Sequence, residues 1–355
     1  MEKQPRQSNF EFLRILSIAM IVAFHSIYFT KFSFDNEISA NKLLYDVLYY
    51  CGELGVNCFI LIGGYFLPVA TFKWKKLALI ILQIYFYFYG CRIATILFTK
   101  APVDSYNLSS WFFPVLQGRY WFLSAYILVY ILTPFLQKLI SQTSKKEFEI
   151  LICSQFLIWS AFPTIFLTAV GRMTESMNFY NRYIWMILLY FVGAYIRIYG
   201  LSVFGTAKKS ILIFVTTSFI LFSYIFLIEI LFHDTKTAIK FWGANSLFQV
   251  ILSLSLFCIF KNLSIESCPK INRVATCVLG IYLLHDGPFS GNIWHKVFVL
   301  AEHENDTLFF ARILFAVVLL MLAGIFVELC RQPFEKYISG ILDKIKIEFN
   351  CRKIL

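Results

Sequence analysis

Residues 9–29 read NFEFLRILSIAMIVAFHSIYF, an apolar run that carries Arg14 near its start and His25 near its end. A hydrocarbon core about 30 Å thick is crossed by roughly 20 residues of α-helix. Ionisable side chains are costly within such a helix, and they usually face a bundle interior or a water-filled cavity. The stretch therefore predicts a membrane-spanning helix with two functionally informative positions.

The same length criterion, applied along the whole chain, predicts ten spans. They lie near residues 12–30, 44–67, 76–99, 119–140, 149–170, 182–199, 210–232, 244–262, 274–287 and 308–330. The ninth is short, and it is expected to be tilted, partly re-entrant or extended by a turn. Because a backbone in lipid must satisfy its own hydrogen bonds, every span is expected to be helical. The predicted fold class is an all-α polytopic membrane protein.

Composition and charge agree with this prediction. The chain is 59% hydrophobic and 15% charged, whereas soluble domains are about 45–50% apolar and about 25% charged. Its formal net charge is +11, but 21 of its 32 basic residues precede the first span or lie in every second turn after it. Cytoplasmic loops of membrane proteins are enriched in Lys and Arg. Both termini are therefore predicted to be cytoplasmic, and no nucleic-acid partner is expected.

The chain is expected to form one transmembrane domain, residues 1–330, followed by a cytoplasmic tail, residues 331–355. The tail has apolar residues at near-helical spacing with lysines between them. It is expected either to lie on the anionic inner leaflet as a basic amphipathic helix or to be solvated. The nine cysteines occur singly, without a CxxC pair, so neither a disulfide framework nor a metal site is expected.

Arg14 and His25 are predicted to share one face of the first span. They are eleven residues apart, which separates them by about 20° around the helix and about 16 Å along it. Arg14 then lies at the cytoplasmic rim, where Glu11 is expected to pair with it. A cation at the entrance and a base in the depth suit a substrate whose anionic part stays outside while its reactive end penetrates. A histidine that is only a hydrogen-bonded core residue is the other interpretation.

Further polar side chains fall in the outer halves of the spans. The second span carries Asp46, Tyr50, Glu53 and Asn57 on one stripe. This stripe either orients His25 and binds hydroxyl groups or forms a ladder of hydrogen bonds between helices.

Charged and aromatic residues of other spans lie at the same level. Arg92 and Glu229 either pair with each other or approach the second span. The fourth span begins with Arg119, Tyr120 and Trp121, and the ninth ends with Tyr282, His285 and Asp286. Aromatic residues at this level serve either as interfacial anchors or as a platform for a sugar ring.

Arg14 and His25, with ten residues between them, resemble the Arg-x10-His signature of the membrane acyltransferase 3 family. That family comprises bacterial O-acyltransferases that act on lipopolysaccharide, capsule, peptidoglycan and other glycans. Four further segments resemble family motifs in the same order: GVNCFILIGGYFL (55–67), WFLSAYILVYILTPFL (121–136), GIYLLHDGPF (280–289) and ELCRQPFEKY (328–337). Lys73 and Lys76 stand where many members have an Arg-x-x-Arg pair, and lysine keeps the charge but not the bidentate recognition of phosphate. Asn57 stands where many members have Asp.

The resemblance implies an enzyme of a bacterial plasma membrane that takes an acetyl group from cytoplasmic acetyl-CoA or a close acyl-CoA. The acceptor is a hydroxyl of a cell-surface glycan, such as a capsule, or of its lipid-linked oligosaccharide precursor. His25 is then the general base or carries the acetyl group in a covalent relay, with Glu53 and Asn57 as groups that orient it. The candidates for binding the donor phosphates are Arg14, Lys73 and Lys76. The candidates on the acceptor side are Arg92, Arg119, Trp121, Tyr282 and His285.

Two other functional classes fit part of the pattern. A transporter or flippase for a lipid-linked sugar or anion also needs a polar outer cavity, although its usual inverted repeats are not apparent. A non-catalytic scaffold of a polysaccharide assembly complex does not need His25 in line with Arg14.

Overall fold

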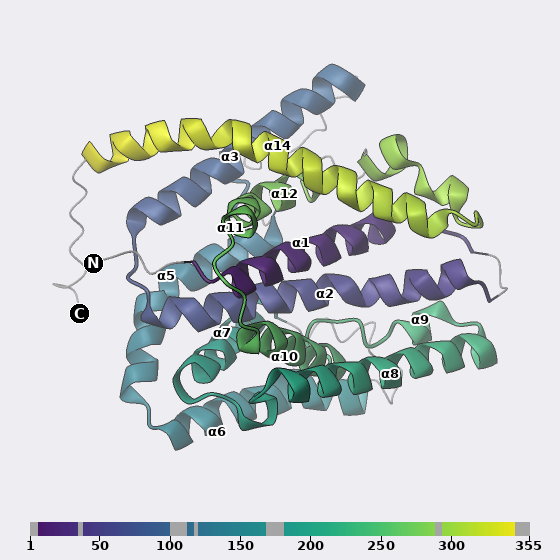
Figure 1. Cartoon of the computed structure of the whole chain (residues 1–355), viewed down its shortest axis with the longest axis horizontal. Helices are drawn as coiled ribbons and strands as arrows, with labels where there is room; N and C mark the ends of the chain where they lie inside the picture. Colours follow the sequence, from purple (N-terminus) through teal and green to yellow (C-terminus); the bar gives the residue numbers. More distant parts are fainter. Residues whose placement is uncertain are drawn as a thin grey trace.

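The computed structural model describes residues 6–34, 38–99, 112–116, 120–167, 181–287 and 293–344, which are mostly helical and contain no β-strand. The long helices run along the long axis of the molecule (Figure 1). The beginning of α1 and the end of α14 are directed toward the same side of the molecule, at the left of the picture. An even number of membrane crossings requires this arrangement.

Seven helices in the described part of the chain are long and apolar enough to cross a membrane. They are α1 (Ser8–Tyr28), α2 (Ala40–Phe66), α3 (Trp74–Thr99), α5 (Trp121–Gln142), α6 (Lys145–Phe156) with the π-helical segments that follow it, α8 (Ala207–Phe232) and α14 (Phe309–Lys344). The prediction of an all-α polytopic membrane protein is confirmed. The shorter elements are 3-10 helices at Leu67–Val69, Ser202–Phe204 and Leu300–His303, π-helical segments at Leu157–Ala161, Pro163–Leu167 and Ile293–Phe298, and α9 (Thr235–Ala238).

The other three predicted spans are also helical, but they are shorter. The sixth is α7 (Arg182–Tyr199), with 18 residues, and the eighth is α10 (Leu247–Asn262), with 16 residues. The ninth is a broken helix made of α11 (Pro269–Ala275) and α12 (Val278–His285). Because α12 packs against α1, α3 and α14, the protein shelters the break from lipid, as non-helical backbone at membrane depth requires.

Hydroxyl side chains set where several of these helices begin. Ser39, Thr206 and Ser246 accept hydrogen bonds from backbone N–H groups in the first turns of α2, α8 and α10. Ser144 and Glu147 form a complete capping box at the start of α6. Each cap satisfies N–H groups that the helix itself leaves without a partner.

Helix α1 lies in the centre of the bundle and contacts α2, α10, α11, α12 and α14 (Figure 1). The neighbouring α2 approaches its partners closely at glycines. A Cβ atom on Gly55 would lie 2.6 Å from the carbonyl oxygen of Ser17 in α1, and one on Gly64 would lie 2.5 Å from that of Tyr190 in α7. Small residues allow such close helix packing in membranes. The adjacent Gly63 instead has open space beside it.

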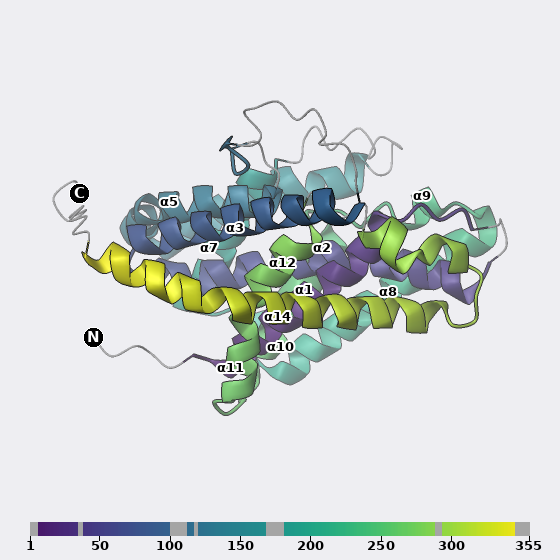
Figure 2. The ribbon, with the colours of Figure 1, turned by 90° about the horizontal axis from the view of Figure 1, so that it is seen from above.

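Helix α14 crosses the predicted domain boundary at residue 331 without a break, although Pro333 lies inside it. Figure 2 shows the C-terminal part of α14 reaching one end of the bundle. Near that end, Asp343 forms a salt bridge of 2.6 Å with Lys75 of α3. The predicted start of the tail thus falls within a helix, and the contact of this segment with the inner leaflet stays a prediction.

Candidate active site

Two cavities inside the bundle meet at His25. The first has a volume of about 330 Å³, and the second has a volume of about 200 Å³. His25 lines both of them, as do Ile21, Val56 and Trp121. One side chain in the middle of the membrane domain can therefore contact molecules that enter from either cavity.

The first cavity has a basic end and, between that end and His25, a section with mostly apolar walls, the apolar shaft. Arg14 and Lys76 line it, and they lie at the predicted cytoplasmic ends of α1 and α3. The side chains between them and His25 are mostly apolar, such as Ile18 and Phe59, and Gly63 leaves room in the wall. Both residues of the Arg-x10-His motif thus line one cavity, as their shared helix face predicts.

The two cations at the basic end are held in different ways. Arg14 donates two hydrogen bonds, of 2.9 and 3.0 Å, to the carboxylate of Glu11, which confirms the predicted pair. Lys76 is exposed, and its ammonium group lies 4.9 Å from the centre of the Tyr130 ring. Both cations remain at the cavity surface, where a phosphate group can reach them.

The second cavity is more polar. Its lining includes Glu53, Arg182 and Asp286 together with the aromatic residues Trp121 and Trp242. The Arg182 guanidinium lies 4.4 Å from the centre of the Trp121 ring, which is a cation–π contact. The Oε2 atom of Glu53 is buried without a hydrogen-bond partner. This cavity therefore offers unused hydrogen-bonding groups beside flat apolar surfaces.

His25 is almost completely buried at the junction. Its Nδ1 atom lies 3.7 Å from Oδ1 of Asp286, and it has no hydrogen-bond partner. The ring of His285 is 5.1 Å from that of His25, measured between ring centres. His285 is itself fixed by a contact of 2.7 Å between its Nδ1 atom and the carbonyl oxygen of Ile281. His25 therefore differs from a hydrogen-bonded core histidine, which His285 resembles.

The structure brings six of the predicted site residues together around the cavities and separates others from them. Those that line a cavity are Arg14, His25, Glu53, Lys76, Trp121 and Tyr282. Lys73 is exposed, and its backbone N–H donates to the Tyr130 hydroxyl. Arg92 is buried in α3 and lines neither cavity. Arg119 lies outside the described residues.

The polar stripe of the second span divides between the two roles that the sequence left open. Glu53 lines the second cavity. Asn57 instead donates to the carbonyl oxygen of Ala244 at 2.8 Å and accepts from the Trp185 indole at 3.0 Å. Tyr50 donates to a backbone carbonyl of α9. Most of the stripe therefore joins helices, and one member faces the site.

Glu229 has a partner that the sequence did not suggest. Its carboxylate lies 2.6 Å from the ammonium group of Lys42 at the start of α2, and it interacts with Asp46 one turn further along. All three side chains are buried. This cluster lines neither cavity, so it ties α2 to α8 away from His25.

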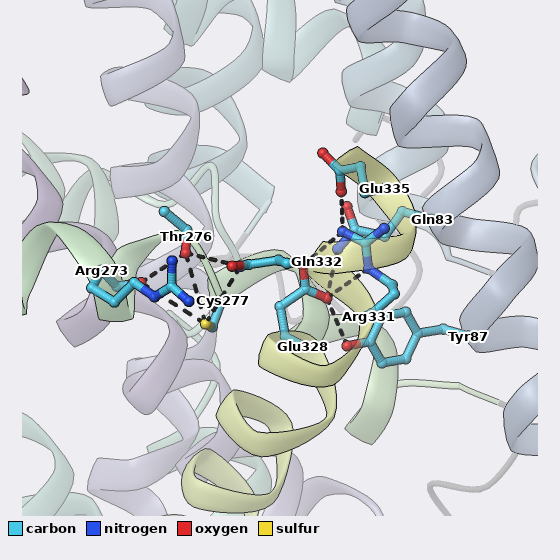
Figure 3. A network of polar contacts seen from close by, with 9 residues as sticks. All are labelled: Gln83, Tyr87, Arg273, Thr276, Cys277, Glu328, Arg331, Gln332 and Glu335. Atoms are coloured by element: carbon cyan, nitrogen blue, oxygen red, sulfur yellow. Dashed lines mark hydrogen bonds and ion pairs between the residues drawn. The ribbon is translucent and has the colours of Figure 1, made fainter. Parts of the chain in front are cut away.

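Figure 3 shows a second polar cluster, which connects the C-terminal half of α14 to α3 and to the break in the ninth span. The carboxylate of Glu328 accepts hydrogen bonds from Gln83, Tyr87 and Arg331. One turn beyond Glu328, Gln332 donates to the Thr276 hydroxyl at 3.0 Å. Because Thr276 also lines the first cavity, this network holds one wall of that cavity in place.

Among the lining residues of the second cavity that were not predicted as site residues, three bear on its chemistry: Arg182, Trp242 and Asp286. Arg182 begins a span, where a basic residue is ordinary, and Trp242 lies in a connection between spans. No feature of the sequence near Arg182 or Trp242 indicates that either residue belongs to a site. Asp286 directly follows His285 in the segment GIYLLHDGPF, so that motif contained a usable signal.

The sequence model of a family described as an acyltransferase domain, the acyltransferase 3 family, matches residues 7–328. The match includes the described lining of both cavities and Glu328. The chain belongs to the acyltransferase 3 family. It is therefore a membrane acyltransferase, which favours group transfer over the transporter and scaffold interpretations. No curated protein and no solved structure matches the chain.

Proposed function

We propose that this acyltransferase moves an acetyl group from cytoplasmic acetyl-CoA to a hydroxyl of a cell-surface glycan or its lipid-linked precursor. The proposal places it in the plasma membrane of a bacterium. The observation that carries the proposal is that His25 lines two cavities of different chemistry. A reaction between a donor and an acceptor that arrive separately needs such a junction.

The first cavity suits the donor. Coenzyme A has phosphates at one end and a thioester at the other, with a thin flexible arm between them. Arg14 and Lys76 provide charge for the phosphates, and the apolar shaft accommodates the arm. Arg14 and His25 are about 16 Å apart along α1. A donor bound by its phosphates at the cytoplasmic rim thus presents its thioester near His25.

The second cavity suits a sugar acceptor. Trp121 and Trp242 offer flat faces against which the apolar face of a sugar ring packs. Glu53 and Arg182 offer an acceptor and donors of hydrogen bonds, and a few polar groups in a largely apolar wall are typical of small-molecule sites. The acceptor reaches this cavity from the side opposite the basic rim, as a glycan presented at the membrane does.

His25 acts as general base in this proposal. It accepts the proton of the acceptor hydroxyl while the oxygen attacks the carbonyl carbon of the thioester. The new C–O ester bond forms, the C–S bond breaks, and the proton passes from His25 to the sulfur of the departing coenzyme A. General bases contribute about 10²–10⁴-fold to rates. Because both cavities reach His25, the two substrates can meet there, and direct transfer needs no acetyl-histidine.

The test compares cells that carry the wild-type protein with cells that carry His25→Ala at the same level in the membrane. The measured quantity is the content of ester-linked acetyl groups on the envelope glycan. The proposal predicts that these esters disappear in the variant while the glycan is still exported. Unchanged acetylation, or failure of glycan export, contradicts the proposal.

A further inference from the structure

We infer that Asp286 is a positioning residue for His25, which holds the imidazole by its Nδ1 atom and leaves Nε2 to take the proton of the acceptor. The inference rests on the proposed role of His25 as general base. It concerns a residue of this chain that contributes no candidate group to the donor cavity. Three features of the structure support it.

The first feature is the pairing itself. Among the described residues, Asp286 carries the one carboxylate within 4.0 Å of a His25 ring nitrogen, with Nδ1 and Oδ1 3.7 Å apart. The two side chains are each 10% exposed, and both line the second cavity. The separation exceeds a hydrogen bond by about 0.5 Å. Catalytic hydrogen bonds are often long without substrate and shorten when the substrate binds.

The second feature is that no other described neighbour of His25 is hydrogen-bonded to its Nδ1 atom. The rings of Phe24 and Phe29 lie against it, with centres 5.5 and 5.0 Å away, and they offer no acceptor for an N–H group. His285 uses its Nδ1 atom at the carbonyl oxygen of Ile281, and its Nε2 atom, although buried without a partner, forms no hydrogen bond with His25. The Nδ1 atom of His25 is buried without a hydrogen-bond partner, so the nearby Asp286 carboxylate is the group positioned to receive its proton.

The third feature is that Asp286 is itself held in place. It is the C-terminal cap of α12, and its backbone N–H donates to the carbonyl oxygen of Tyr282 at 3.1 Å. Arg182 lines the same cavity and supplies a positive charge that interacts with both Asp286 and Glu53. The backbone that carries the Asp286 side chain is therefore held in place, and the positive charge of Arg182 lies near its carboxylate.

The chemical consequence is a choice of tautomer. A carboxylate that accepts from Nδ1–H keeps Nε2 unprotonated and stabilises the imidazolium that forms when Nε2 takes a proton. An asparagine at the same place can instead donate its amide N–H to Nδ1. The proton of the neutral ring then lies on Nε2, and His25 loses its capacity to act as base.

The test measures kcat and the KM for acetyl-CoA of Asp286→Asn in membranes that contain the acceptor glycan. We expect kcat to fall by about 10²-fold or more. The KM for acetyl-CoA is expected to stay within about threefold, because Asp286 does not line the donor cavity. Asp286→Glu restores the carboxylate and is expected to recover at least about tenfold of the lost kcat.

Asp306→Asn provides a matched control. Asp306 also faces a histidine, with Nδ1 of His303 2.8 Å from its Oδ2 atom, but this pair lines neither cavity. Its kcat is expected to equal that of the wild type. If Asp286→Asn does not accumulate in the membrane, Asp286→Ser, which removes the carboxylate from the same space, takes its place with the same expected kcat.

The outcomes separate this inference from the proposed function. A variant without the Asp286 carboxylate that keeps the wild-type kcat, beside an inactive His25→Ala enzyme, overturns the inference and leaves the proposed function intact. A loss expressed only in the KM for acetyl-CoA, or a loss of kcat that Asp286→Glu does not relieve, also overturns it. Activity in His25→Ala itself contradicts the proposed function.

Discussion

Two of the buried polar clusters in the described part of the protein differ in how completely their hydrogen bonds are made. Around Glu328, the carboxylate accepts from Gln83, Tyr87 and Arg331 (Figure 3). Around His25, by contrast, Nδ1 of the histidine and Oε2 of Glu53 are buried without a hydrogen-bond partner. The first cluster is closed by the protein, and the second lies open to two cavities.

This difference separates the cluster around Glu328, which we interpret as structural, from the cluster around His25, which we interpret as functional. Buried polar groups cost free energy unless they are hydrogen-bonded, so most of them in native proteins have partners. Unpaired polar groups at the wall of a cavity lower the stability of the empty protein. A bound substrate can offset this free-energy cost by forming the missing hydrogen bonds. We therefore expect substitutions at Glu328 to affect stability and substitutions at His25 to affect the reaction.

Glu328→Ala is the substitution expected to break the closed cluster most strongly. It leaves the charge of Arg331 buried, with Glu335 as its remaining salt-bridge partner among the described residues. Removal of one partner from a buried ion pair typically costs about 3–5 kcal/mol. The expected result is a large fall in the melting temperature and in the amount of protein that stays monodisperse in detergent. An unchanged melting temperature contradicts the structural role of the cluster.

Gly63 and Gly64 are adjacent in α2, and substitutions at them are expected to separate an effect on stability from an effect on binding of the donor. Gly64→Ala places a methyl group 2.5 Å from a backbone oxygen of α7, and such overpacking costs about 1–3 kcal/mol. Gly63→Leu meets open space at the first cavity. It is expected to keep the melting temperature and to raise the KM for acetyl-CoA. Comparison of melting temperatures and KM values for the two variants checks both expectations, and the reverse pattern would show that the two glycines are assigned wrongly.

Asn57→Ala separates the two roles within the polar stripe of α2. It leaves the Trp185 indole N–H and the Ala244 carbonyl group without their partner, which costs about 1–3 kcal/mol. The folded fraction is expected to keep the wild-type kcat. Glu53→Gln serves as the comparison variant and is expected to lower kcat at an unchanged melting temperature. A selective loss of kcat in Asn57→Ala would return this residue to the catalytic candidates.

Lys76→Ala sharpens the contrast between the two cavities with the smallest expected effect. Loss of one cation at the basic end is expected to raise the KM for acetyl-CoA by about tenfold, which corresponds to about 1.4 kcal/mol, and to leave kcat unchanged. Lys73→Ala is the control, because Lys73 is exposed and lines neither cavity. Equal effects of the two substitutions would show that general surface charge, and not the lining of the first cavity, governs binding of the donor.

Local pattern predicted the helices and the face that Arg14 shares with His25. Both follow from the length of apolar runs and the period of the helix, which are properties of neighbouring residues. The second cavity was less predictable because its members are distant in the sequence. Trp121 begins α5 and Arg182 begins α7, and nothing near either residue indicates the contact between them.

The same limit explains the predicted residues whose placement differs from their expected role. Asn57 has the spacing of a residue that faces His25, yet its partners lie 128 and 187 residues away in the sequence. Likewise, the break in the ninth span is contacted at Thr276 by Gln332, which is 56 residues away in the sequence. Periodicity describes which residues share a face, but the helices that cover this face decide which of them bond and which stay open.

The central claim is that donor and acceptor meet at His25, and the transfer rate of His25→Ala tests it most directly. The measurement follows labelled acetyl groups from acetyl-CoA to the glycan in membranes with equal amounts of wild-type and variant protein. The account predicts a rate at least about 10²-fold lower, with an unchanged melting temperature and undiminished binding of acetyl-CoA. Transfer at the wild-type rate would contradict it.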